Sequence, residues 1–135
     1  MGQFRAVAHP WLCDVMGHLT TRHYIAIFDD ASYHFFFEMF GWSGADINDG
    51  LGFADVRHEI DYAAEVGAGD LLSVSGRLVR LGTKSVTVVY DMVNLSREEQ
   101  AATLKSVTVC FDTRSRKAVA WPDAWRRIAD AALSG

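Results

Sequence analysis

The order of apolar and polar positions along the chain predicts one long helix. Between residues 21 and 40, apolar side chains recur three and four positions apart, which is the spacing of one helix face. This face consists of Tyr24, Phe28, Ala31, Phe35 and Met39. Gly41 stands where a helix C-cap is expected, because glycine readily adopts the left-handed conformation. The opposite side also carries Tyr33 and Phe37, so we expect other structure to wrap around this helix.

Alternating and β-branched segments predict strands before and after the helix. A short strand is expected over residues 3–9, ended by Pro10, which has no N–H to donate. Further strands are expected over residues 56–62, 71–81, 85–93, 101–111 and 118–121. In the segment 56–62, the alternation places Val56 on the same face as His58, Ile60 and Tyr62. A terminal helix is expected to begin near Asp123, which suits an N-cap. This order predicts an α+β fold with an antiparallel sheet.

Composition limits the chain to one compact domain over residues 1–135. Half of the residues are apolar and 22% are charged, which is typical of a globular protein, and no repeat or Pro/Ser-rich linker interrupts the chain. The net charge of −4 and the lack of a broad basic surface argue against nucleic acid as a partner. No apolar stretch approaches the ~20 residues of a membrane span, and no secretory leader begins the chain, so we expect a cytoplasmic protein.

The loop before the long helix is the best place to look for chemistry. Asp14, Gly17 and His18 lie just ahead of the helix N-terminus, where backbone N–H groups lack partners and the helix dipole is positive. N–H groups near Thr20 and Thr21 can polarise a carbonyl, while Asp14 activates water or attacks the carbon. The structural alternative is that Asp14 and Thr20 only cap the helix. Spacing alone leaves both interpretations open.

The segment WLCDVMGHLTTRHYIAIFDDASYHFF resembles the signature of the hotdog-fold acyl-CoA thioesterases, in particular the 4-hydroxybenzoyl-CoA thioesterase-like group. The matching positions are Asp14, Gly17, His18, Tyr24 and Asp29. The resemblance continues through residues 60–85, where Gly69-Asp70 and the turn Gly82-x-x-Ser85 follow in the family's order. It implies a hotdog fold: one long central helix wrapped by a five-stranded antiparallel sheet, with a short C-terminal helix here.

The resemblance also implies hydrolysis of an acyl-CoA thioester, with coenzyme A as part of the substrate and no separate cofactor. Asp14 would be the catalytic carboxylate, the Thr21 N–H the oxyanion donor, and His18 a group that orients Asp14. The substrate-binding candidates are Gly17, Thr20, Tyr24, Arg57, His58, Ser85, Arg114, Arg116 and Lys117. Many relatives have amides where this chain has Thr20 and Thr21. Relatives also often carry an Arg where this chain has Ser32, so a pairing expected for Asp29 is missing.

Several other residues have simpler interpretations. The thiolate of Cys13 would be disfavoured beside Asp14, and Cys13 and Cys110 are expected to be reduced thiols. The spacing of His9, His18 and His23 matches no helical pair of metal ligands, so we expect no metal. The basic turn at Arg114, Arg116 and Lys117 can hold CoA phosphates, but a solvated hairpin turn is the simpler explanation and the one we prefer.

Exposed apolar residues on the long helix predict a homo-oligomer, either a dimer or a dimer of dimers. The resemblance implies the same assembly. Two other functions remain open at this stage: a non-catalytic binder of acyl-CoA or another small ligand, and a hotdog dehydratase or hydratase. The position of the acid ahead of the helix favours hydrolysis. The acyl group and the choice between general-base and covalent mechanisms cannot be predicted from these residues.

Overall fold

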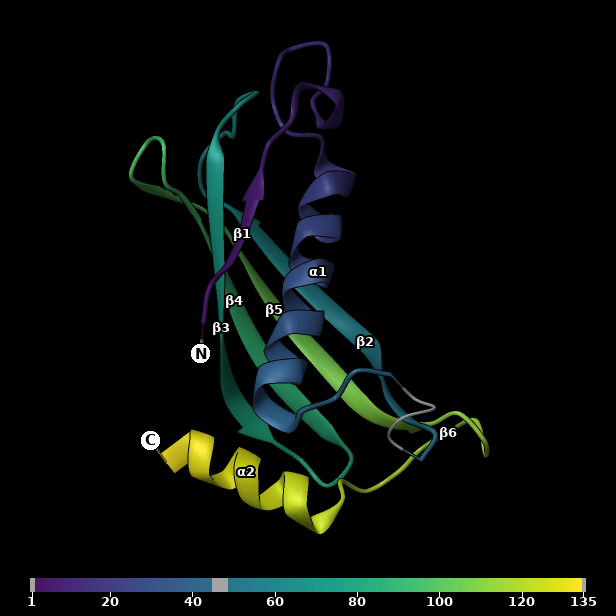
Figure 1. Ribbon diagram of the computed structural model, residues 1–135. Helices are drawn as coiled ribbons and strands as arrows, with labels where there is room; N and C mark the ends of the chain where they lie inside the picture. The colour runs from purple at the N-terminus through teal and green to yellow at the C-terminus, as the bar shows by residue number, and fades with distance from the viewer. Residues whose placement is uncertain (1, 45–48, 135) are drawn as a thin grey trace.

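The computed structural model describes residues 2–44 and 49–134. Its elements are β1 (Phe4–Val7), the 3-10 helix η1 (Pro10–Leu12), α1 (Thr21–Phe40), β2 (Leu51–Tyr62), β3 (Leu71–Leu81), β4 (Ser85–Asn94), β5 (Glu99–Asp112), β6 (Lys117–Ala118) and α2 (Asp123–Ser134). The strands form one antiparallel sheet in the order β1-β3-β4-β5-β2, and β6 pairs with the end of β5. Figure 1 shows that this sheet curves along α1, while α2 lies near the C-terminal end of α1.

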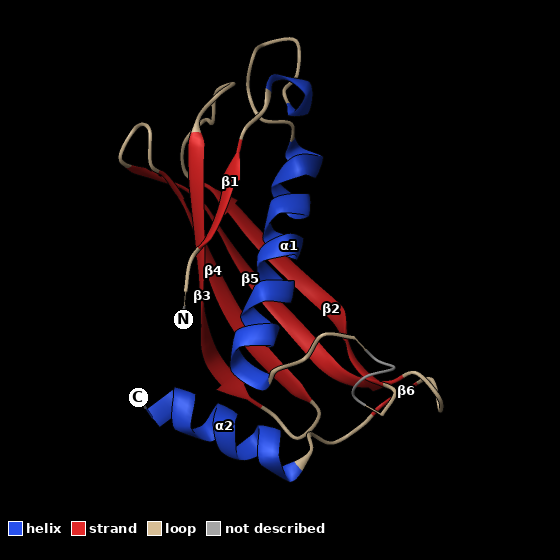
Figure 2. Ribbon diagram, viewed as in Figure 1, coloured by secondary structure: helices blue, strands red, loops and turns tan. Residues whose placement is uncertain are grey.

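This arrangement confirms the predicted α+β fold with one long helix against five main antiparallel strands (Figure 2). The predicted bounds of α1 and β3 are the observed ones. All five residues of the predicted apolar helix face are buried. Gly41 ends α1 in the left-handed conformation, with φ of 70°, and its N–H donates to the Phe37 carbonyl at 2.8 Å. No described helix is both long enough and apolar enough to cross a membrane.

Three details of the predicted strands are wrong. β2 begins at Leu51, and a β-bulge between Asp55 and Arg57 resets its alternation. Val56 is therefore 61% exposed and does not share the inner face with His58. The strand expected over residues 118–121 is reduced to the two-residue β6. Asp123 is the first residue of α2, a shift of one position that is common at helix ends.

An aromatic cluster closes the space where α1, β2 and α2 meet. The Phe36 and Phe53 rings stack with centroids 4.1 Å apart, and Phe40 stacks on Trp125 at 4.9 Å. The Trp42 ring meets Phe53 edge-on at 5.0 Å, and its indole N–H donates to the Leu51 carbonyl at 2.9 Å. Paired rings add to the stabilisation from burying their apolar area. The cluster therefore fixes how β2 lies beside the C-terminal half of α1.

Gly76 in β3 lets α1 approach the sheet closely. A Cβ atom at this position would lie 2.8 Å from Cδ2 of Phe35 and 3.0 Å from the Tyr90 ring. Both rings belong to the buried core, which has little room to repack. We expect Gly76→Ala to lower the free energy of unfolding by about 1–3 kcal/mol, measured by urea denaturation. Ser75→Ala, on the outer face of the same strand, is the control. Equal unfolding midpoints for the two variants would contradict this packing argument.

Candidate active site

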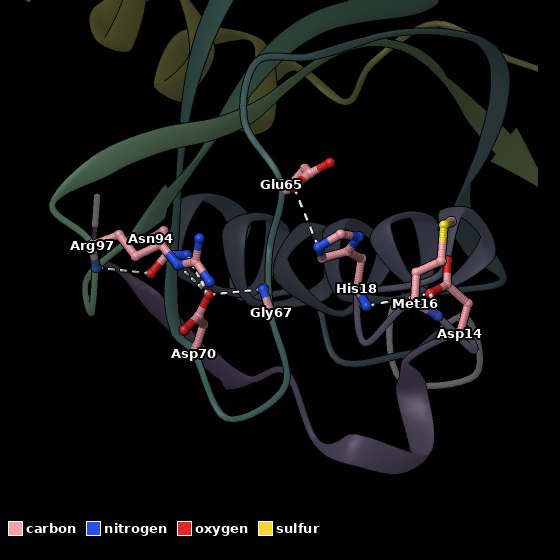
Figure 3. A network of polar contacts seen from close by, with 8 residues as sticks. All are labelled: Asp14, Met16, His18, Glu65, Gly67, Asp70, Asn94 and Arg97. Carbon is pink, nitrogen blue, oxygen red and sulfur yellow. Dashed lines mark hydrogen bonds and ion pairs between the residues drawn. The ribbon is translucent and has the colours of Figure 1, made fainter.

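Asp14 sits in a tight turn that its own side chain helps to close. Its Oδ1 accepts hydrogen bonds from the backbone N–H groups of Met16 at 2.9 Å and His18 at 3.3 Å (Figure 3). The backbone adds bonds from Asp14 N–H to the His18 carbonyl and from Gly17 N–H to the Asp14 carbonyl. Gly17 has a φ of 80°, a conformation that favours glycine. Within the described residues, no hydrogen bond or ion pair reaches Oδ2 of Asp14, and the residue is exposed.

The helix N-terminus beside this turn has free donors. Thr20 occupies the N-cap position of α1, but no side chain caps the helix. The Thr20 N–H donates to the Leu12 carbonyl at 3.0 Å. Among the described residues, no oxygen accepts a hydrogen bond from the N–H of Thr21. The prediction that the Asp14 and Thr20 side chains cap the helix is therefore wrong. The Asp14 side chain closes its own turn, and Thr20 stands at the N-cap position without a hydrogen bond from its hydroxyl to the helix.

The loop of Val66, Gly67 and Ala68 is hydrogen-bonded to the segment that carries the Asp14 turn. The Leu19 N–H donates to the Val66 carbonyl at 2.7 Å, and the Ala68 N–H donates to the Gly17 carbonyl at 3.2 Å. The His18 imidazole points toward this loop, with Nε2 at 3.2 Å from a Glu65 carboxylate oxygen (Figure 3). His18 thus reaches Asp14 through its backbone N–H, while its ring contacts Glu65.

Asp70 anchors the supporting loop, a role that the sequence analysis missed. Its Oδ2 accepts hydrogen bonds from the Gly67 N–H and the Asn94 amide, both at 2.8 Å, and Arg97 Nε lies 3.1 Å away (Figure 3). Burial raises the pKa of Asp70, but the hydrogen bonds from Asn94 and Gly67 and the charge of Arg97 outweigh it, so the pKa lies below its usual value. The Gly69-Asp70 pair was visible in the sequence, but its partners were not.

Tyr24 lies in the first turns of α1 and is 6% exposed. Its ring meets the Tyr62 ring edge-on, with centroids 5.0 Å apart. Burial raises the pKa of Tyr24, and the neighbouring Tyr62 and Glu65 raise it further. The structure therefore brings Tyr24 to the same end of the helix as Asp14, as a buried neutral phenol.

Three predicted substrate-binding residues lie on the sheet strands, outside the Asp14 turn: Arg57, His58 and Ser85. Arg57 and His58 are neighbours in sequence but point to opposite faces of β2: Arg57 contacts Glu59 at 2.6 Å, and His58 Nε2 lies 3.5 Å from Asp55. Ser85 begins β4, and its carbonyl accepts a hydrogen bond from the Trp121 indole near α2. None of these three residues lies in the Asp14 turn.

The basic turn is also remote from Asp14 within one chain. Arg114, Arg116 and Lys117 follow β5, next to the segment that begins β2, and the Thr113 N–H donates to the Gly50 carbonyl at 2.9 Å. The C-terminal end of α1 leads into this region, whereas Asp14 precedes the N-terminal end (Figure 1). A helix of 20 residues is about 30 Å long. The turn is exposed, and the Arg116 guanidinium lies over the Phe111 ring.

The cysteines show no sign of a nucleophile. Both are free thiols, and Cys13 donates from Sγ to the His9 carbonyl at 3.5 Å. Burial raises the pKa of Cys110 to about 11, with a further contribution from Asp112, so its thiolate is disfavoured at neutral pH. In the part of the chain that the structure describes, no group of three His, Cys, Asp or Glu side chains is arranged to hold a metal.

Known structures share this architecture along nearly the whole chain. SAV2348 from Staphylococcus aureus, solved in complex with CoA, is 15% identical with a TM-score of 0.87, covering 98% of this chain and 83% of that one. A DHNA-CoA thioesterase from Staphylococcus aureus is 16% identical with a TM-score of 0.86, and the match covers 98% of this chain and 90% of that one. YbaW, a probable thioesterase from Escherichia coli, is 19% identical with a TM-score of 0.79, covering 97% and 98%. No curated protein matches the sequence.

The long helix, the curved antiparallel sheet and these structural matches define a hotdog fold. The family model of the thioesterase-like superfamily matches residues 8–129. The chain therefore belongs to the thioesterase-like superfamily, which confirms the family resemblance seen in the sequence.

Asp70 provides a test of how the supporting loop is held. Asp70→Asn removes the charge that pairs with Arg97, so we expect it to lower the free energy of unfolding at pH 7 by about 1–3 kcal/mol. A carboxyl group with a lowered folded pKa stabilises the fold above its unfolded pKa of about 4, and this contribution disappears as the pH falls through the folded pKa. The difference between wild type and variant should therefore shrink in acid, measured by urea denaturation from pH 7 downward. The exposed Asp61→Asn is the control, and a difference independent of pH would contradict the assignment.

Proposed function

We propose that this protein hydrolyses an acyl-CoA thioester to a free acid and CoA. The observation that carries this proposal is the exposed Asp14 carboxylate, fixed in the turn that leads into a helix whose Thr21 N–H has no partner among the described residues. A carboxylate and a backbone donor are the two groups that acyl transfer needs: one supplies or activates a nucleophile, and the other stabilises the oxyanion.

In this mechanism the thioester carbonyl oxygen accepts a hydrogen bond from the Thr21 N–H. Asp14 uses its Oδ2 either to take a proton from an attacking water or to attack the carbonyl carbon itself. The carbon–sulfur bond then breaks and CoA leaves as the thiolate. In the general-base route the thiolate takes up the proton held by Asp14, and in the covalent route water hydrolyses the mixed anhydride on Asp14, releasing the free acid and restoring the carboxylate. The turn from Asp14 to His18 restricts the carboxylate, so little orientational freedom is lost when the substrate binds. Thr20, Gly17 and Tyr24 form the surroundings of the bound thioester.

Family membership and two of the structural relatives support this function. SAV2348 was solved in complex with CoA, and Slr0204 from Synechocystis is a 1,4-dihydroxy-2-naphthoyl-CoA thioesterase with a TM-score of 0.79 and 18% identity. We extend CoA recognition from these relatives to this chain as part of the proposal. The basic residues Arg114, Arg116 and Lys117 contribute to the same site only if a second chain brings them to Asp14.

Asp14→Asn separates catalysis from structure. Asparagine keeps the volume of the side chain and an oxygen acceptor for Met16 and His18, but it is neither a base nor a nucleophile. We expect kcat to fall by about 100-fold or more on the best substrate from a panel of acyl-CoAs, measured as release of free CoA. The unfolding midpoint should change little.

Asp61→Asn, which neutralises an exposed carboxylate on β2, is the matched control and should keep the wild-type kcat. A folded Asp14→Asn variant with wild-type kcat would overturn this mechanism. Wild-type protein that binds acyl-CoA in a direct binding assay but releases no CoA would favour a non-catalytic binder.

We also propose that the protein is a homodimer or a dimer of dimers. Tyr33 and Phe37 on α1 are each 56% exposed, and β2 is an edge strand that pairs only with β5 among the described residues. Exposed aromatic residues beside an unpaired strand edge are features of surfaces that associate. A second copy would cover this apolar surface.

Light scattering at micromolar concentration should give a mass of at least two chains. Phe37→Lys should shift the protein toward the monomer, because it places a charge in the apolar surface. Asp30→Lys, an exposed polar position on the same helix, is the control and should leave the mass unchanged. A wild-type mass of one chain would contradict this assembly.

A further inference from the structure

A small cavity between α1 and β2 has walls of an unusual kind. Its volume is about 90 Å³, the share of about three water molecules. The lining residues are Asp29, Ser32, Tyr33, Phe36, Trp42, Phe53 and Asp55. Four of these seven residues are aromatic, and the two charged ones are both acidic. The cavity thus combines aromatic rings with negative charge and has no basic side chain in its lining.

The aromatic walls are held in place before any ligand binds. The Trp42 indole is fixed by its hydrogen bond to the Leu51 carbonyl at 2.9 Å, and its ring contacts both Tyr33 and Phe53. Phe53 in turn stacks on the buried Phe36. Rings that are fixed by such contacts lose little conformational freedom when they receive a ligand.

Among the described residues, the two carboxylates in the cavity have no Lys or Arg partner. Asp55 Oδ1 accepts a hydrogen bond from Thr108 at 2.7 Å, and His58 lies 3.5 Å from Oδ2. Within the described residues, no Lys or Arg forms an ion pair with Asp29 or Asp55. Arg57 of β2 contacts Glu59 instead. Partial burial raises the pKa of Asp29, the negative charges of Asp55 and Asp30 raise it further, and His58 lowers it by a smaller amount.

We propose that this cavity binds an alkylated ammonium group. A positive charge would relieve the repulsion between Asp29 and Asp55, and aromatic faces attract cations, most strongly when the cation is poorly hydrated. Hard metal ions are poorly matched, because they require several oxygen ligands and resist losing water. A group such as trimethylammonium has the charge, the apolar surface and the small size that these walls accept.

The position of the cavity suggests where this ammonium group comes from, and this step rests on the proposed function. Ile25, Asp29, Ser32 and Phe36 follow Thr21 at intervals of three or four residues, so they share one side of α1. The helix rise places the Asp29 backbone about 12 Å beyond Thr21, and its side chain tilts back toward the N-terminus. An acyl chain of about four to eight bonds, at roughly 1.2 Å per bond, would link a thioester carbonyl at Thr21 to the cavity. The ammonium group is therefore the head of the acyl chain.

The site can be tested without the enzymatic reaction. Tetramethylammonium chloride is titrated into wild-type protein while the indole N–H signal of Trp42 is followed by NMR, with tert-butanol as a neutral molecule of similar size. We expect saturable binding of tetramethylammonium and no saturable binding of tert-butanol. Asp29→Asn should weaken binding at least tenfold, because it removes one of the two charges that face the cavity. Asp29 forms no ion pair with another described residue, so we expect the variant to fold, which circular dichroism checks.

Asp30→Asn is the matched control: it removes the same charge from the same helix, but Asp30 does not line the cavity. It should weaken binding less than twofold. Trp42→Leu is a second variant; because it lacks the reporting indole, its binding is measured by isothermal titration calorimetry beside wild type, and it should weaken binding as strongly as Asp29→Asn. Absence of saturable binding to wild type, or equal binding by Asp29→Asn and wild type, would overturn the site.

The origin of the head group has a kinetic test. Two acyl-CoAs are compared, one with an acyl chain ending in trimethylammonium and one ending in the neutral tert-butyl group. We expect kcat/KM to favour the ammonium substrate at least tenfold in wild type, and this preference to be lost in Asp29→Asn. Equal kcat/KM values in wild type would overturn the assignment to the acyl chain. No turnover of either substrate would count against thioester hydrolysis, whereas the tetramethylammonium titration tests the cavity separately.

Discussion

The structure depends on the burial of α1, a helix with apolar side chains on more than one side. A flat sheet would cover only one face of such a helix, so the antiparallel strands must curve around it. Gly76 allows a close approach, where Phe35 meets the sheet beside Tyr90. The side of α1 near β2 is covered less completely, and this side holds the cavity between Asp29 and Asp55. The same constraint therefore determines both the fold and the position of the proposed cation site.

The two ends of α1 are stabilised by different kinds of interaction. At the N-terminal end, polar contacts dominate: the turn at Asp14 is held by the loop of Gly67, and Asp70 holds that loop. At the C-terminal end, stacked rings around Phe53 dominate. Charge-assisted hydrogen bonds orient atoms precisely, while ring stacks mainly contribute buried area. This division leaves the directional interactions at the end where the proposed chemistry takes place.

Local patterns were sufficient for the helix but not for β2 or for the second loop. The periodicity of α1 extends over 20 residues, and Gly41 marks its end, so its bounds follow from the sequence. β2 starts earlier than expected, because Gly52 and Ala54 weaken its strand signal and the bulge at Val56 breaks the alternation. Asp70 could not be assigned, because Asn94 and Arg97 reach it from 24 and 27 positions away through the pairing of β3 with β4. Contacts of this range depend on strand register, which one sequence does not reveal.

The turn that carries Asp14 has a consequence for how the protein can change during evolution. Its hydrogen bonds use the carboxylate and the backbone, and within the described residues none uses the side chain of Val15 or Met16. These two apolar residues are fully and 72% exposed. Substitutions there would alter the surface that an approaching molecule meets first, while the carboxylate keeps its position. In the proposed catalytic role of Asp14, the residues that first meet a substrate are thus separate from the residue that reacts, so Val15 and Met16 can change while Asp14 is kept.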